Sequence, residues 1–138
     1  MRRILIALTL TLTAAPASAQ TPEQSAAAQC ASPHPDLAIA GCTALIQTPK
    51  QTAKLLVFAY NDRAWAYHAL GKDTEGLRDV DMALILAPKN AAIIETRAEI
   101  EEKLGKRDPA IADYRAALKL DPKMKEASDG LTRLKATP

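Results

Sequence analysis

Apolar residues recur every three or four positions along most of the chain, which is the spacing of helices with one buried face. This spacing and the punctuation by Pro, Gly, Asp and Asn predict six helices. They are expected over Asp36–Gln47, from Thr48 or Ala53 to Leu70, from Asp73 to Pro88, from Asn90 to Gly105, from Asp108 to Pro122, and after Pro122. No stretch alternates with a period of two for long enough to indicate a strand. The predicted fold is therefore all-α.

The same residue types return 34 positions later in the chain. The matched positions are Arg63 and Arg97, Ala64 and Ala98, Gly71 and Gly105, Ala83 and Ala117, Leu84 and Leu118, and Pro88 and Pro122. Asp36–Gln47 resembles the second half of such a unit, displaced by an insertion of four residues at Thr48–Thr52. The chain is thus predicted to repeat a helix–turn–helix unit and to begin with a half-repeat.

A 34-residue unit of this kind resembles the tetratricopeptide repeat. The residues at the family's pattern positions are Tyr60, Arg63-Ala64, Tyr67, Gly76, Val80 and Pro88 in one unit, and Ile94, Arg97-Ala98, Glu101, Ala110, Tyr114 and Pro122 in the next. Arg63, Arg97 and Glu101 stand where the family has apolar residues. The resemblance implies an α-solenoid of antiparallel helix pairs over residues 36–138, with about two full repeats and terminal half-repeats. It also implies that the chain binds other proteins.

The first residues have the order of a secretory signal peptide. Arg2 and Arg3 precede an apolar run over Ile4–Leu12, and Ala17-Ser18-Ala19 offers a small-residue cleavage site. Because the run is far shorter than the roughly 20 residues that span a bilayer, no membrane span is expected after cleavage. Residues 1–19 are therefore predicted to direct the protein to the periplasm or outside the cell. Residues 20–35 are expected to form a flexible lead-in.

Charge and motifs exclude several classes of function. Of the 18 Lys and Arg residues, two lie in the expected signal peptide, which leaves 16 to balance 16 Asp and Glu. A neutral chain offers no electrostatic footprint for nucleic acid. His34 and His68 are far apart, and the chain has no Gly-rich phosphate loop and no metal-ligand spacing. We therefore expect no catalytic residue, no cofactor and no bound metal.

Cys30 and Cys42 are the chain's two cysteines. Export to an oxidising compartment would favour a disulfide between them, and no C-x-x-C or haem-attachment sequence suggests another use. We predict that they are bridged. Closing the loop between them contributes about 3 kcal/mol on the chain-entropy estimate.

In the tetratricopeptide repeat family the first helix of each repeat lines a concave surface, and the resemblance places eight residues there. They are Phe58, Asn61, Trp65 and His68 in one repeat and Ala92, Glu95, Glu99 and Glu102 in the next. The aromatic group would anchor a ligand, and the three glutamates would favour a basic partner. Each of these two predictions has an alternative. Trp65 could instead pack on the N-terminal half-repeat. The glutamates could instead form a solvated face whose charge is offset by Lys103, Lys106 and Arg107.

Two functions follow from this pattern. The first is an exported interaction module that binds a protein or peptide through the residues at the concave surface. The second is a homo-oligomeric scaffold, because two repeats are fewer than the three that usually give an independently stable array.

Overall fold

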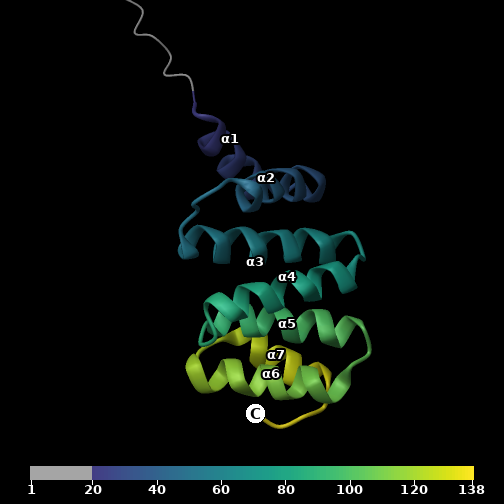
Figure 1. Cartoon of the computed structure of the whole chain (residues 1–138). Coiled ribbons are helices and arrows are strands. Elements are labelled where there is room, and N and C mark those ends of the chain that lie inside the picture. Colours follow the sequence, from purple (N-terminus) through teal and green to yellow (C-terminus); the bar gives the residue numbers. More distant parts are fainter. Residues whose placement is uncertain (1–19) are drawn as a thin grey trace, which may run out of the picture.

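Seven stacked helices make up residues 20–138, the part of the chain that the computed structural model describes (Figure 1). They are α1 (Pro22–Cys30), α2 (Pro35–Gln47), α3 (Ala53–Ala69), α4 (Asp73–Leu86), α5 (Ala91–Lys103), α6 (Arg107–Leu120) and α7 (Lys125–Arg133). Residues 20–138 contain no strand, so the all-α prediction is confirmed. None of these helices is both long and apolar enough to cross a bilayer. The expected signal peptide, residues 1–19, lies outside the described residues.

Local signals in the sequence set the ends of the repeated helices. The Thr52 hydroxyl accepts a hydrogen bond from the Leu55 amide at 3.2 Å, which fixes the start of α3 at Ala53 and not at Thr48. The Asn90 side chain caps α5 in the same way. Gly71 and Gly105 follow α3 and α5 at φ values of +70° and +72°, a conformation that costs glycine little. Consecutive helices therefore turn back on one another as antiparallel pairs.

The expected flexible lead-in is wrong for most of its length, because residues 22–30 form helix α1. Thr21 and Gln24 form a capping box, and Pro22 takes the first helical position, where its missing N–H costs nothing. Ala26 and Cys30 are buried against α2. The backbone of α1 approaches Gly41 so closely that a Cβ there would lie 2.6 Å from the Ala26 carbonyl oxygen.

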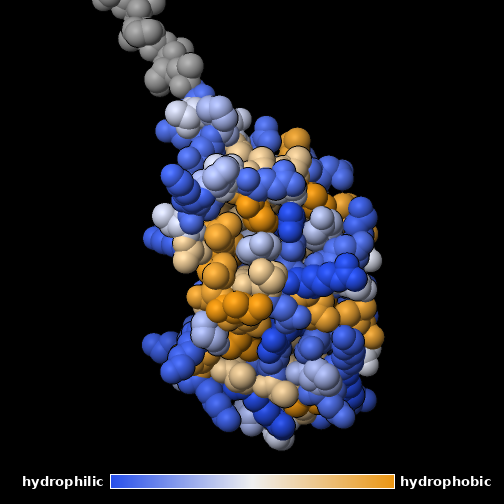
Figure 2. All heavy atoms as spheres, viewed as in Figure 1, coloured by the Kyte–Doolittle hydropathy of each residue, from blue (hydrophilic) through white to orange (hydrophobic). Residues whose placement is uncertain are grey.

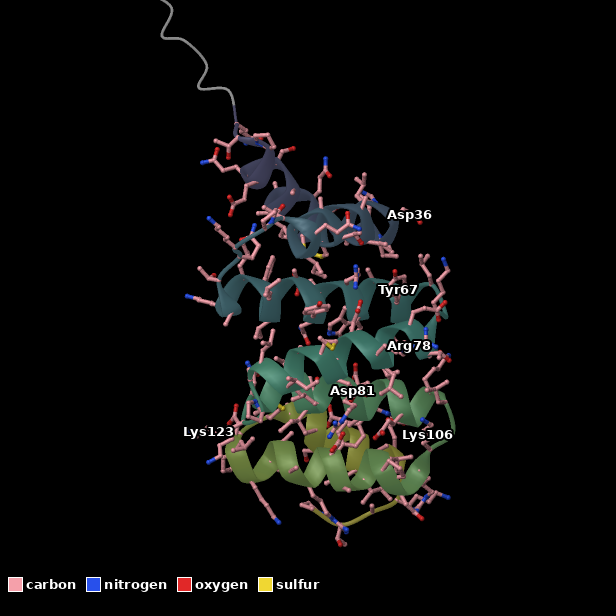
Figure 3. All side chains as sticks on the ribbon, in the orientation of Figure 1. Asp36, Tyr67, Arg78, Asp81, Lys106 and Lys123 are labelled. Carbon is pink, nitrogen blue, oxygen red and sulfur yellow. A yellow bond between two sulfur atoms is a disulfide. The ribbon has the colours of Figure 1, made fainter. Side chains whose placement is uncertain are left out.

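Helix α1 also changes the number of repeats. The chain forms three helix pairs, α1–α2, α3–α4 and α5–α6, and α7 packs on the last pair. The expected N-terminal half-repeat is thus a complete but short pair. A disulfide joins Cys30 of α1 to Cys42 of α2 and is the yellow bond between these helices in Figure 3.

The apolar side chains form two cores. The larger core runs from α3 to α7 and contains Tyr114, Ile100 and Leu131, each with less than 2% of its surface exposed. The smaller core joins α1, α2 and α3 around Cys30, Cys42 and Leu45. At the C-terminal end, α7 can cover Tyr114 because residue 130 is glycine, and any Cβ at that position would overlap the tyrosine ring.

The two arginines that depart from the family pattern are clamps between helices. Arg63 on α3 donates to both carboxylate oxygens of Asp79 on α4, at 2.7 and 2.8 Å, and to the Thr43 hydroxyl of α2 at 2.9 Å. Arg97 on α5 repeats this arrangement with both oxygens of Asp113. Its third contact is Asp81 of the preceding pair, labelled in Figure 3. Each arginine therefore joins its own helix pair to the pair before it.

Candidate functional site

A shallow hollow of about 490 Å³ lies where α3, α5 and α7 meet. We call it the groove, and its lining residues are Trp65, His68, Glu99, Glu102, Lys103 and Arg133. Four of the eight residues that the sequence places at the concave surface line it: Trp65, His68, Glu99 and Glu102. The first helices of successive pairs supply the groove, as the repeat geometry requires.

Trp65 is the most exposed aromatic residue of the groove. Its surface is 44% exposed, so it is not a core residue. The indole lies edge-on to the His68 ring, with 5.7 Å between ring centroids. His68 is itself held by Asp73, whose carboxylate oxygen lies 2.5 Å from the imidazole Nδ1. Trp65 also borders a second hollow, which lies toward the end of α1. Trp65 thus lines the groove, as one prediction had it, and also faces the N-terminal helix pair, as the alternative had it.

Glu102 is engaged in a contact that fixes α7. Its carboxylate accepts hydrogen bonds from the Arg133 guanidinium at 2.9 and 3.1 Å and from the Tyr114 hydroxyl at 2.7 Å. The guanidinium of Arg133 is the main reason that the pKa of Glu102 lies below its usual value. The charge of Glu102 is therefore paired within the groove lining, and Glu99 is the other acidic residue of that lining.

Glu95 lies one helical turn before Glu99 on α5 and is buried, although the sequence placed it among the groove residues. Only 8% of its surface is exposed, and its Oε1 atom has no hydrogen-bond partner within the described part of the chain. Burial raises the pKa of Glu95 to about 7, and the neighbouring carboxylates of Glu99 and Glu126 act in the same direction. Arg133 opposes them only weakly. A buried acid without a cationic partner thus lies next to the groove.

Replacing Glu95 with glutamine should stabilise the protein at pH 8 by about 3 kcal/mol, because a raised carboxyl pKa makes ionisation destabilising. The folded-state pKa of about 7 lies above the unfolded value near 4.5. The contribution of Glu95 is therefore present below about pH 4.5 and is lost as the pH rises through 7. Urea unfolding of both proteins between pH 4.5 and 8 measures this difference. Parallel pH profiles would contradict the burial of an ionisable Glu95.

The remaining predicted residues lie away from the lining of the groove. Phe58 packs partly buried against the smaller core, so its ring belongs to the fold. Asn61 is partly buried, and its Oδ1 atom lacks a hydrogen-bond partner among residues 20–138. Ala92 is exposed near the start of α5.

Arg133 is the groove residue that the sequence reasoning missed. Trp65, Glu99 and Arg133 are spaced by 34 positions, and all three line the groove. Extending the repeat register by one more unit into α7 would have found Arg133. Lys103 was named only as a charge that offsets the glutamates, but it borders the groove directly.

Stacked antiparallel helix pairs with a hollow along their first helices define an α-solenoid interaction protein. The solved structures that resemble this chain are of that class. An Arabidopsis OM64 TPR domain matches with a TM-score of 0.66 and 28% identity, over 73% of this chain and 80% of that one. The first TPR of Spaghetti (RPAP3), solved with the HSP90 peptide SRMEEVD, also has a TM-score of 0.66, with 26% identity over 73% and 77%. In fold and in sequence this chain is thus similar to tetratricopeptide repeat domains.

Curated relatives agree with this assignment. Hsp70-Hsp90 organizing protein 3 of Arabidopsis thaliana is 35% identical over 77 residues, and Hsp70-Hsp90 organizing protein 1 of Glycine max is 33% identical over 75. These matches cover 56% and 54% of this chain but only 14% and 13% of the relatives. No family model matches the sequence.

Proposed function

We propose that this protein binds a basic segment of a partner protein in the groove. The observation that carries the proposal is an exposed tryptophan beside unneutralised carboxylates. Glu99 contributes negative charge, and buried Glu95 adds to it as the pH rises above about 7, whereas the nearby Arg133 is already paired with Glu102. Lysine or arginine side chains of a ligand would supply the missing positive charge.

The groove is suited to a different ligand from the one in the neighbouring RPAP3 structure. That peptide, SRMEEVD, carries three carboxylate side chains and one arginine. In this chain such a ligand would meet Glu99, and like charges brought together at an interface cost several kcal/mol. The tetratricopeptide fold is therefore shared, and we propose that the sign of the preferred ligand charge is reversed.

Aromatic contact would provide most of the affinity. Buried tryptophan side chains are the commonest strong contributors to protein interfaces, and Trp65 still has 44% of its surface to bury. Its position against His68 limits the conformations of the indole before a ligand arrives. Less conformational entropy is then lost on binding.

Trp65 is the only tryptophan of the chain, so its fluorescence reports directly on the groove. A lysine-rich decapeptide should change the emission in a saturable way, and a glutamate-rich decapeptide of equal length should not. Glu99→Lys should weaken binding of the lysine-rich peptide about tenfold, because it replaces attraction by repulsion beside the indole. Glu75→Lys changes the net charge equally on the exposed surface of α4 and serves as the control.

Equal weakening by both variants would mean that only net charge matters, and that result would contradict a binding site in the groove. Calorimetry with the same peptides provides a second readout that does not depend on the environment of Trp65. Raising the pH through 7 should also strengthen binding, since Glu95 becomes ionised in that range.

A homo-oligomeric scaffold is the second candidate, and one surface favours it. Met82, Ile85 and Leu86 follow helical spacing on α4 and are 41%, 71% and 38% exposed. Figure 2 shows hydrophobic side chains gathered on the face where α3 and α4 lie. Light scattering over a concentration series separates the two candidates, because a scaffold should gain mass with concentration and lose this gain on Ile85→Ser.

Export to the periplasm or the medium is part of the proposal. Its support is the order of residues 2–19 and the disulfide between Cys30 and Cys42, which persists in oxidising compartments. Mass spectrometry of the protein from its native source tests it. A chain that begins at Gln20 is expected, and a chain that still carries residues 1–19 would contradict cleavage.

A further inference from the structure

The second hollow, which has a volume of about 260 Å³, lies between the α1–α2 turn and α3. We propose that this hollow, which we call the anchor pocket, receives an apolar side chain of the same basic peptide. The inference rests on the proposed function and extends it, because it specifies the ligand as an apolar residue followed or preceded by a basic one.

The chemistry of the anchor pocket is that of an apolar side-chain site. Its walls include Pro33 of the α1–α2 turn, Pro35 and Ala38 of α2, and Trp65, Ala66 and Ala69 of α3. The volume is several times the roughly 30 Å³ that a water molecule occupies in the liquid, so a side chain of leucine size can enter. Small alanine side chains on two helices leave this space, and the two prolines line it.

Asp62 borders the same pocket, and its carboxyl group favours a positively charged ligand. Burial raises the pKa of Asp62, and the hydrogen bond from Asn61 only partly offsets this effect. A lysine, an arginine or a backbone N–H beside the apolar side chain would compensate that burial. A carboxylate of the ligand at the same place would instead add electrostatic repulsion to the cost of burying Asp62. The anchor pocket therefore favours an apolar side chain that has a lysine or arginine near it in the ligand sequence.

The indole of Trp65 lies between the anchor pocket and the groove and lines both. Neighbouring packed helices lie about 8–10 Å apart, and an extended peptide advances about 3.3 Å per residue. One continuous peptide would thus reach from the anchor pocket to Glu99 in about two to four residues. The ligand pattern that fits is an apolar residue separated from a lysine or arginine by this distance.

A panel of decapeptides tests the inference. The parent peptide contains only lysine and serine, and each other member has one leucine at a different position. Calorimetry with the whole protein should find that leucine at one or two positions improves affinity about tenfold. Ala69→Phe fills the anchor pocket and should remove this gain without changing the affinity for the parent. Ala44→Phe places the same side chain on the exposed surface of α2 and should leave the gain intact.

The outcomes separate the two proposals. If the parent peptide binds but leucine improves affinity at no position, the anchor pocket is not a ligand site and the groove remains one. The same conclusion follows if the gain from leucine survives in a folded Ala69→Phe variant. If the parent peptide fails to bind the wild-type protein, both the proposed function and this inference are wrong. Circular dichroism of both phenylalanine variants shows whether they keep the helical fold.

Discussion

Replacing Arg63 with alanine should lower the free energy of unfolding by about 3 kcal/mol, because it leaves a buried carboxylate without its partner. The side chains of Arg63 and Asp79 are only 16% and 8% exposed. The variant also loses the hydrogen bond to Thr43 and the contacts of the guanidinium with two tyrosine rings, whose centroids lie 5.7 and 5.9 Å away. Urea unfolding followed by circular dichroism measures the change.

Arg78→Ala is the matched control, since it removes the same side chain from the exposed surface of α4. Its expected effect is within about 0.5 kcal/mol. The double variant Arg63→Ala, Asp79→Ala should recover part of the loss, because no unpaired charge remains buried. Equal destabilisation by Arg63→Ala and Arg78→Ala would contradict the clamp between helix pairs.

The sequence contained the information for these clamps without revealing their geometry. Asp79 and Asp113 are 34 positions apart, as are Arg63 and Arg97. The repeat register thus predicts that Arg63 and Asp79 interact in the same way as Arg97 and Asp113. Pairing itself depends on how two antiparallel helices lie side by side, which the pattern of apolar positions does not fix. For this reason the arginines could be recognised as exceptions but not as clamps.

Helix α1 was missed because its stability comes from contacts distant in the sequence. Alanines and glutamines give its nine residues no marked apolar stripe, so periodicity carried little signal there. The capping box of Thr21 and Gln24 was visible in the sequence and would have indicated a helix start. What secures the helix is the close approach of its backbone to Gly41 and the disulfide.

The sequence predicted which residues share the helix faces at the candidate site, but it did not predict which of them are buried. Counting along α3 and α5 placed Trp65, His68, Glu99 and Glu102 together, and they line one groove. The same counting placed Glu95 with them, but it is buried close to charged groups of α5 and α7. Burial of one position on a helix face depends on where the next helix crosses, and helical periodicity does not contain that information.

Removing the disulfide by the double replacement Cys30→Ala, Cys42→Ala should cost about 3 kcal/mol, since it frees the unfolded chain from a short closed loop. The two cysteines are separated by 12 positions and are almost completely buried, at 1% and 0% exposure. Calorimetric or urea unfolding of the variant and of the wild-type protein measures the difference. A reducing agent should lower wild-type stability toward that of the variant and should leave the variant unchanged.

The loss should be concentrated in the first helix pair, and it should reach ligand binding through the anchor pocket. Cys30 lies at the end of α1, where it borders the pocket and precedes the turn that carries Pro33 and leads to Pro35 of α2. Without the disulfide, hydrogen exchange should accelerate in α1 and α2 while α5 and α6 keep their protection. The affinity gained from a leucine in the ligand should shrink, and binding of the lysine–serine parent in the groove should persist. Uniform loss of protection across all helices would instead mean that the array unfolds as one unit, with the disulfide supporting the groove and the anchor pocket alike.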